Sequence, residues 1–339
     1  MATRVLLTID TELTWRPYSS GAGWRDNLAA SFDPAGVGIP HQLALLARHG
    51  LKACFFVDPM PALLYGPEPV RAMVGPILAA GQEVQLHLHP VWADLARGQC
   101  EGARFELTQY DLAGQTELIA AARDLLVAAG APAPVAFRSG SYAANADTLA
   151  ALARLGLRFD SSHNGAEHPW PSALPLAAAE LDPVELGGVV EIPIGQIARR
   201  GGGLRPLQLC AVSAGEMRSA LRHAAAAGHP LVTIVGHSFE LASRDGRRVN
   251  RLVSGRFERL CAFLADHRST LPTATFAGLP PLERPAAASR PLAAKPLRTG
   301  RRMIEQAWGN ARYERPLSSA LAAAAPIAAL GWLAAYAGL

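Results

Sequence analysis

Residues 83–90, Glu-Val-Gln-Leu-His-Leu-His-Pro, constrain the fold more than any other stretch of the chain. A strand alternates its side chains between two faces, so His87 and His89 point the same way. Pro90 cannot donate to a sheet, so it ends the strand and leaves both imidazoles at the carboxyl end, where α/β barrels carry their chemistry. Two imidazoles aimed at one point are a metal-binding pattern. The motif alone leaves a second interpretation equally open, a pair of satisfied histidines at a polar strand end.

The first strand ends in a matching way. Residues 4–12 form a near-continuous apolar run that finishes with two carboxylates, Asp10 and Glu12, again two positions apart and therefore on one face. A carboxylate pair that faces a histidine pair suits a divalent metal, with one carboxylate left as a base. A capping or turn role for the two carboxylates is the alternative. Strand parity cannot decide which of the two would bind the metal.

The rest of the chain alternates strands and helices. After a long predicted loop at 13–40, the apolar periods predict helices at 39–49, 69–80, 110–129, 147–155, 213–227 and 249–267, and strands at 51–59, 135–142, 157–162, 189–194, 230–237 and 273–276. About seven strands in such units predict a parallel sheet, either doubly wound or closed into a barrel. Arg138 ends the fourth strand, placed to hold a carboxylate by a bidentate bond, and His237 ends the seventh. Because four strands contribute functional residues, we expect a barrel.

Composition narrows the range of partners. The formal charge of the 339-residue chain is +4, but the basic excess lies after residue 280, and no basic patch interleaved with aromatic residues precedes it. We therefore expect no nucleic-acid binding. Four cysteines without a CxxC pair predict free thiols in a reducing, cytoplasmic compartment. A secretory signal is not expected, because the first residues already form the strand that carries Asp10 and Glu12.

The last sixty residues change character. Residues 1–280 form the predicted catalytic domain, 281–316 read as a basic linker rich in proline and alanine with a short helix at 303–312, and 317–339 carry no charge over 23 residues. That length is close to what a bilayer span needs, and the arginines before it would stay inside. We expect this tail to attach the protein to the inner face of a membrane, or else to form an apolar helix docked on the barrel.

Five segments occur in the order of the motifs of a known family. They are Thr8–Glu12, Ala53–Val57, Gly81–His87, Phe137–Tyr142 and Val235–His237. In this order they resemble the polysaccharide deacetylases, the NodB-like proteins of carbohydrate esterase family 4, over roughly residues 3–277. The resemblance implies a distorted (β/α)7 barrel of the α/β class. It also implies a divalent metal, usually zinc, and hydrolysis of acetyl groups from N-acetylated or O-acetylated sugars.

The resemblance also implies roles for single residues. Asp10 matches the catalytic base, Arg138 the arginine that orients it, and His237 the general acid. Thr11 stands where the family has a metal-binding aspartate, and we expect Glu12 to replace it because Glu12 shares the face of Asp10. His87 matches the first metal-binding histidine.

The second metal-binding histidine of the family is replaced by Val91, so His89 is the expected substitute. Tyr142 matches the aromatic residue after the arginine. With Trp15 and Trp92 it is a candidate for contact with an acetylated carbohydrate substrate, and Trp24 is a further candidate platform. Packing of the tryptophans in the 13–40 loop onto the barrel is the alternative for Trp15 and Trp24.

Two other functions fit the same residues. One is a different metal-dependent glycan hydrolase on a seven-stranded barrel, which would cut the glycosidic bond with a carboxylate pair. The other is a catalytically silent carbohydrate-binding protein that keeps the barrel and has lost the metal. Reducing sugar released without acetate would favour the first, and the absence of bound metal the second.

Overall fold

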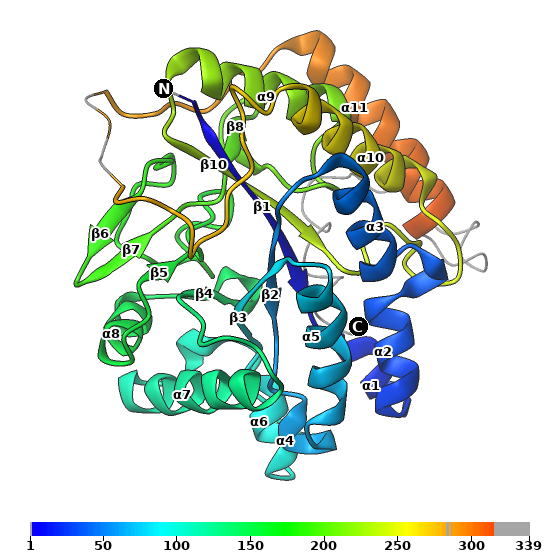
Figure 1. Cartoon of the computed structure of the whole chain (residues 1–339), viewed down its shortest axis with the longest axis vertical. Helices are drawn as coiled ribbons and strands as arrows, with labels where there is room; N and C mark the ends of the chain where they lie inside the picture. Colours follow the sequence, from blue (N-terminus) through cyan, green and yellow to red (C-terminus); the bar gives the residue numbers. More distant parts are fainter. Residues whose placement is uncertain (1, 283–284, 286, 315–339) are drawn as a thin grey trace.

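The computed structural model describes residues 2–282, 285 and 287–314 (Figure 1). Its centre is a curled sheet with the strand order β10-β1-β2-β3-β4-β5-β7-β6, in which every pair is parallel except β6 with β7. The strands are β1 (Arg4–Thr11), β2 (Cys54–Val57), β3 (Glu83–Leu88), β4 (Ala136–Ser139), β5 (Phe159–Asp160), β6 (Val184–Leu186), β7 (Val189–Glu191) and β10 (Leu231–His237). Seven parallel strands and a curled sheet confirm the predicted distorted (β/α)7 barrel.

β1 lies in the middle of the molecule (Figure 1). It pairs with β10 from Arg4↔Leu231 to Asp10↔His237 and with β2 on its other side. Side chains on both faces of β1 are buried, including the consecutive Val5, Leu6 and Leu7, each 0% exposed. The sequence of a parallel strand that is covered on both faces is expected to be continuously apolar rather than alternating between apolar and polar residues. The site residues at its end therefore stand on one of the best-buried strands of the fold.

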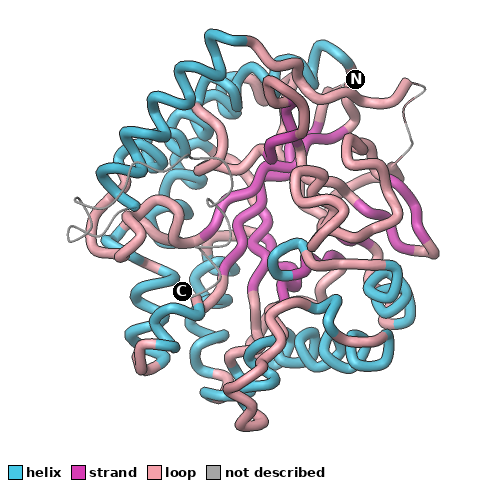
Figure 2. The backbone as a smooth tube through the Cα atoms, turned by 180° about the vertical axis from the view of Figure 1, so that it is seen from behind, coloured by secondary structure: helices cyan, strands magenta, loops and turns pink. Residues whose placement is uncertain are grey.

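Helices surround the sheet on the outside, and Figure 2 shows the strands enclosed between them and the connecting loops. The α-helices are α1 (Trp15–Ser19), α2 (Trp24–Phe32), α3 (Ile39–His49), α4 (Ala62–Tyr65), α5 (Glu68–Ala79), α6 (Val91–Ala96), α7 (Leu112–Ala128), α8 (Ala146–Arg154), α9 (Ala214–Ala227), α10 (Arg251–Asp266) and α11 (Pro296–Gly309). Short 3-10 turns cover Pro34–Gly36, Leu107–Gln109 and Gly140–Tyr142, and a π-turn covers Asn310–Glu314. The capping box predicted at the start of α9 is present, with Ser213 and Glu216 bonded to each other's backbone amides.

The barrel is not closed by a regular ladder. Between β7 and β10 the connection is made by single hydrogen bonds to β10 from the loop segments around Gly195 and around Leu207–Leu209. Gly195 donates its amide to the Thr233 carbonyl at 2.9 Å, and Leu209 donates to Val235 at 3.0 Å. A two-stranded hairpin, β8 (Gln196–Ala198) with β9 (Leu204–Pro206), lies between these contacts in the sequence. This seam is the distortion in the barrel.

Several sequence predictions need correction. The prediction of a long loop at 13–40 is wrong, because α1, α2 and a 3-10 turn form there. Helices this short do not produce an extended periodic pattern of apolar residues in the sequence. The strand predicted at 273–276 is reduced to one bridge between Val5 and Thr273. The hairpin β8–β9 was not predicted, since its strands are only three residues long. All four cysteines are free, as predicted, but only Cys54 and Cys261 are buried as we expected, because Cys100 is exposed.

The region after residue 280 is more ordered than its composition indicates. α11 begins at Pro296, seven residues before the predicted short helix, so much of the predicted linker is helical. The tail 317–339 lies outside the described residues. Within the described part of the chain, no helix combines the length and the apolar character that a bilayer crossing requires.

Two buried carboxyl groups lie on neighbouring strands near the β6 edge of the sheet. Asp160 of β5 and Glu191 of β7 are register partners, and both are 0% exposed. Asp160 accepts from the Ser162 hydroxyl at 2.6 Å, and Glu191 accepts from the His163 amide at 2.8 Å. Burial raises the pKa of Glu191 well above its ordinary value, and the neighbouring Asp160 adds to the shift. The pair therefore holds a proton that an exposed glutamate would have released.

We predict that Glu191→Gln stabilises the protein, and more so at higher pH. A carboxyl whose pKa is raised by folding costs stability once the pH exceeds its unfolded value, whereas the amide mimics the protonated form at every pH. Thermal unfolding should show little or no gain at pH 4 and a gain of about 1–2 °C at pH 8, which corresponds to about 1 kcal/mol in a chain of this size. Glu117→Gln, at an exposed position of α7, is the matched control and should change little at either pH. An equal gain in unfolding temperature at both pH values would contradict the proposal that the Asp160–Glu191 pair holds a proton.

Candidate active site

The ends of four parallel strands converge on one group of polar side chains. Asp10 lies on β1, His87 on β3 and Arg138 on β4, His237 ends β10, and Glu12 and His89 each follow their strand by one residue. None of the six is more than 7% exposed. Parallel strands present their carboxyl ends at one rim, so residues far apart in the sequence meet there. The structure thus brings together the predicted metal ligands and the predicted catalytic residues.

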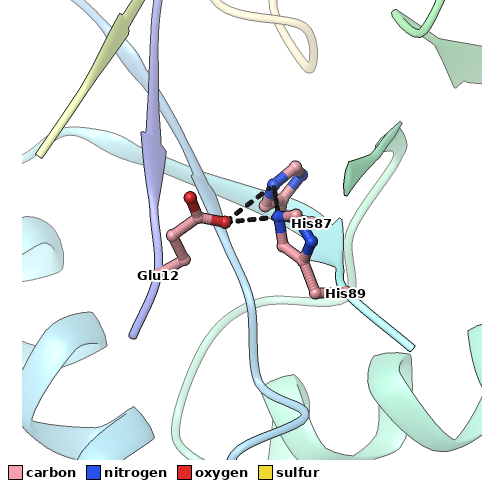
Figure 3. Close-up of side chains that lie close together, drawn as sticks. All are labelled: Glu12, His87 and His89. Carbon is pink, nitrogen blue, oxygen red and sulfur yellow. Dashed lines mark hydrogen bonds and ion pairs between the residues drawn. The ribbon is translucent and has the colours of Figure 1, made fainter. Parts of the chain in front are cut away.

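Glu12, His87 and His89 form a compact group of donor atoms (Figure 3). The Oε2 atom of Glu12 lies 2.5 Å from Nε2 of His89 and 3.3 Å from Nε2 of His87. The two Nε2 atoms lie 3.2 Å apart. All three side chains point at the same place between the ends of β1 and β3, as strand parity predicts.

Each histidine is held in position by the neighbouring strand. Nδ1 of His87 lies 2.8 Å from the Arg138 carbonyl oxygen, which can only accept, so Nδ1 carries a proton. In neutral His87 the Nε2 lone pair is then directed at the group, the arrangement typical of metal-binding histidines. His89 packs its ring on Gly140, where a Cβ atom would come within 2.4 Å of the ring. Gly140 is therefore required for the position of His89.

This donor set fits a divalent metal. Two donors that are each about 2.0–2.1 Å from a tetrahedral zinc lie about 3.3 Å apart, close to the separations between His87 and the other two donors. One carboxylate and two imidazoles are also a ligand combination used by catalytic zinc sites. Burial alone would raise the pKa of Glu12, but His89 and His87 outweigh it and hold the pKa well below the ordinary value. A charged carboxylate ligand is thus available.

Asp10 belongs to a second group, organised by Arg138. Its Oδ1 accepts from Nη1 of Arg138 at 2.6 Å, and Arg138 is 0% exposed. The predicted bidentate bond is wrong, because the other guanidinium nitrogens donate to the backbone oxygen and the hydroxyl of Ser161, both at 3.1 Å, and Nη1 also donates to Thr8. The Oδ2 atom of Asp10 is left facing His237, 3.8 Å from its Nε2.

His237 has a partner that the sequence did not indicate. Its Nδ1 lies 2.8 Å from Oε1 of Glu240, and Gln208 donates to the same carboxylate oxygen. Burial works to lower the pKa of His237, but the charges of Glu240 and Asp10 outweigh it and raise the pKa to about 9. Glu240 follows the strand by three residues in a loop, where neither parity nor periodicity marks it.

Asp58 was also missed. It follows β2 directly, its amide donates to the Thr11 carbonyl at 3.0 Å, and its side chain accepts from the Met60 amide at 2.9 Å. Burial raises its pKa to about 7 against the opposing effect of His89. The sequence did contain a signal, because Val57-Asp58-Pro59 is another strand that ends in a carboxylate and a proline. Asp58 adds a further acidic group beside the metal-ligand candidates.

The aromatic candidates lie in different surroundings. Tyr142 is 4% exposed and follows Ser141 in a turn where both residues have left-handed backbone angles, φ 57° and 54°. Trp15 is half-buried against Tyr18 and Phe105, as the packing alternative expects, and Trp24 is half-buried with Arg25 stacked on its ring.

The prediction that Trp92 contacts substrate has no support in the structure. Trp92 lies on α6 and is 1% exposed between Tyr18 and Tyr65, so it offers no free ring face to a sugar. In the sequence Trp92 is a large aromatic residue close to the two histidines. In the structure the packing of α6 directs its side chain into the core.

Comparison with known proteins places the fold. No known family profile and no curated protein sequence matches the chain. Among solved structures, a protein from Mycobacterium smegmatis described as a polysaccharide deacetylase matches with a TM-score of 0.50 and 18% identity, covering 80% of this chain and 86% of the other. A family 4 carbohydrate esterase from Streptomyces lividans has a TM-score of 0.41 and 17% identity, with 85% and 98% of the two chains covered.

A third structure shows that the same barrel carries other activities. A 4-alpha-glucanotransferase from Thermococcus litoralis matches with a TM-score of 0.50 and 11% identity over 81% of this chain, which spans only 40% of that larger protein. Fold similarity at such identities does not transfer an activity. The ordered motifs and the structural match agree on one conclusion: the chain has the barrel fold of the polysaccharide deacetylases.

Proposed function

We propose that the protein is a metal-dependent hydrolase that removes acetyl groups from an acetylated carbohydrate. The observation that carries this proposal is the separation of the two strand-end carboxylates. Glu12 faces the two histidines, whereas Asp10 lies between Arg138 and His237. One carboxylate is thus placed to bind a metal and the other to move a proton, which is the division of labour that acyl hydrolysis needs.

Glu12, His87 and His89 would hold the metal, most suitably Zn²⁺. A bound zinc polarises a carbonyl oxygen and lowers the pKa of a coordinated water. Asp10 accepts the proton of the attacking water through Oδ2, since Oδ1 is occupied by Arg138 at 2.6 Å. Arg138 is fixed by Thr8 and Ser161, so the carboxylate is held in one orientation before substrate arrives.

His237 is the general acid in this mechanism. Glu240 accepts from Nδ1, which leaves the Nε2 proton directed toward the side of Asp10. The 3.8 Å between Nε2 and Asp10 Oδ2 is longer than a hydrogen bond, so the two groups are not locked to each other. His237 can then deliver its proton to the departing amine or alcohol of the sugar.

The burial of the site favours a small reacting group. The side chains of Glu12 and His87 are only 3% exposed, whereas those of His89 and His237 reach 8% and 9%. These two histidines are therefore the most accessible of the four side chains. An acetyl group projecting from a sugar suits a site this buried better than a glycosidic bond in the middle of a chain, which must pass between two carboxylates.

We predict that the metal depends on Glu12, His87 and His89 and not on Asp10. His87→Ala, His89→Ala and Glu12→Gln each remove or weaken one donor of a three-donor site, so the bound metal should fall well below one per chain. Asp10→Asn keeps the shape of the side chain and should stay loaded. Metal analysis of the four purified variants checks this. An Asp10→Asn protein without metal beside a loaded Glu12→Gln protein would show that the two carboxylates have the opposite roles.

We predict that Asp10→Asn lowers acetate release by about 10²-fold or more, because an amide cannot accept the proton of the attacking water. The assay measures acetate and reducing sugar from a panel of N-acetylated and O-acetylated glycans. Acetate without chain cleavage supports the proposal. Reducing sugar without acetate would favour a glycosidase instead, and a metal-free wild-type protein that binds glycans without releasing either product would favour a silent binder.

We predict that turnover falls as the pH rises through about 9, because His237 must be protonated to act as the acid and its pKa is raised to about 9. Glu240→Gln removes the charge that contributes most to raising this pKa while keeping a hydrogen-bonding group. The alkaline limb of the kcat profile should therefore move to lower pH. Glu240→Asp, which restores the charge, should move it back. An unchanged limb in Glu240→Gln would show that Glu240 does not act on His237.

A further inference from the structure

Helix α11 is attached to the barrel through its polar side. Nε of Arg302 lies 3.3 Å from Oε1 of Glu216 on α9, and Nη2 of Arg256 on α10 donates to Glu305 at 3.1 Å. Arg302 is 7% exposed, so the docked face is occupied by charged groups. An amphipathic helix on a globular protein normally turns its apolar stripe inward. α11 has the opposite orientation.

The apolar side chains of α11 face outward. Leu297 is 90% exposed, Ile304 74% and Trp308 52%, and the spacing of seven and four residues places them on one stripe. Met303 beside them is 58% exposed. These four account for most of the large hydrophobic side chains exposed anywhere in the described residues. Figure 1 shows α11 at the outer edge of the molecule, beyond α10.

A basic groove borders this stripe. A cavity of about 220 Å³ between α9 and α11 is lined by eight residues, four of them arginines: Ser213, Gly215, Glu216, Arg218, Ser219, Arg222, Arg298 and Arg301. The only acid in its lining, Glu216, is already bonded to Arg302 and to the Ser213 amide. Arg301 lies four residues after Leu297 and three before Ile304, so the groove and the stripe share one side of the helix.

We propose that this face of α11 rests on the surface of an anionic phospholipid bilayer. The stripe of Leu297, Ile304 and Trp308 would enter the interface, and the arginines of the groove would bind headgroup phosphates. A helix with aromatic and aliphatic residues on one side and arginines beside them is the pattern of interfacial membrane helices. Guanidinium groups bind phosphate oxygens through two parallel hydrogen bonds. In the sequence, the charge-free segment 317–339 begins eight residues after α11.

Other binding partners for this face of α11 would match either the apolar stripe or the basic groove, but not both. The segment 317–339 folded back onto the stripe would cover the apolar residues, but it has no charge to neutralise the four arginines. A second copy of the chain would bring its own arginines to the interface, and like charges would face each other. An anionic membrane satisfies the apolar stripe and the basic groove together.

The test is flotation of the full-length protein with vesicles of phosphatidylcholine alone and with vesicles that also contain phosphatidylglycerol. The wild type should float with the anionic vesicles at low salt and less at high salt. A Leu297→Ser, Ile304→Ser, Trp308→Ser variant should lose binding by about tenfold or more, because three interfacial side chains are removed. Arg298→Gln with Arg301→Gln should lose about tenfold or more and show a weaker salt dependence. Circular dichroism confirms that these surface variants are folded.

The matched control is Leu63→Ser with Val127→Ser. These exposed apolar residues lie on α4 and α7 at the other end of the molecule, and the control should bind like the wild type (Figure 1). Binding unchanged in both the stripe and the arginine variants would assign the membrane contact to another segment and overturn the proposal. Failure of the wild type to float with anionic vesicles would overturn it as well. A wild-type dimer that becomes monomeric in the stripe variant, without vesicle binding, would identify a second copy as the partner.

Discussion

The ion pair between Arg138 and Asp10 is the interaction on which the site depends. Both groups are buried, and an incompletely satisfied buried pair would destabilise the fold. Arg138 avoids this because all three guanidinium nitrogens donate, to β1 through Asp10 and Thr8 and to Ser161 beyond β5, while its charge lies 4.3 Å from the centre of the Phe56 ring. Its carbonyl oxygen also orients His87. One residue therefore fixes the base and, through the backbone, a candidate metal ligand.

The six strand-end groups form two electrostatically distinct halves. On one side, His89 and His87 keep Glu12 ionised, and its Oε2 atom lies within 3.3 Å of both Nε2 atoms. On the other, Glu240 and Asp10 favour the protonated form of His237. A site that needs a deprotonated ligand and a protonated acid at one pH can have both only if their environments differ in this way. The register pair Asp10↔His237 sets the spacing of the base and the acid on adjacent strands, whereas Glu240 contacts His237 from the loop that follows β10.

Sequence reasoning predicted the parts of the site that follow from strand parity. Residues two apart at a strand end must share a face, so the histidine pair His87 and His89 and the carboxylate pair Asp10 and Glu12 could be predicted from the pattern alone. The choice of Glu12 as the ligand came from the family resemblance, and the order of the motifs predicted the barrel. Glu240 and the packing of Gly140 against His89 were not accessible, because each depends on loops whose course is set by tertiary contacts. Trp92 illustrates the same limit, since His89 three residues before it is at the site but the Trp92 ring is in the core. The outward orientation of the apolar stripe of α11 could not be predicted either, because an exposed apolar stripe and a buried one give the same sequence pattern.

The seam between β7 and β10 gives the two halves of the site unequal mechanical support. The strand β10 that carries His237 has a seven-pair ladder with β1 on one side, but only isolated backbone bonds from Gly195 and the segment 207–209 on the other. Gln208, which touches both His237 and Glu240, belongs to that weaker side. Regions held by few backbone bonds open at lower free energy than the ladders beside them. Thermal opening of the barrel should therefore begin at the proton donor and leave the Glu12 and histidine group assembled, so that acid catalysis would be lost before metal affinity.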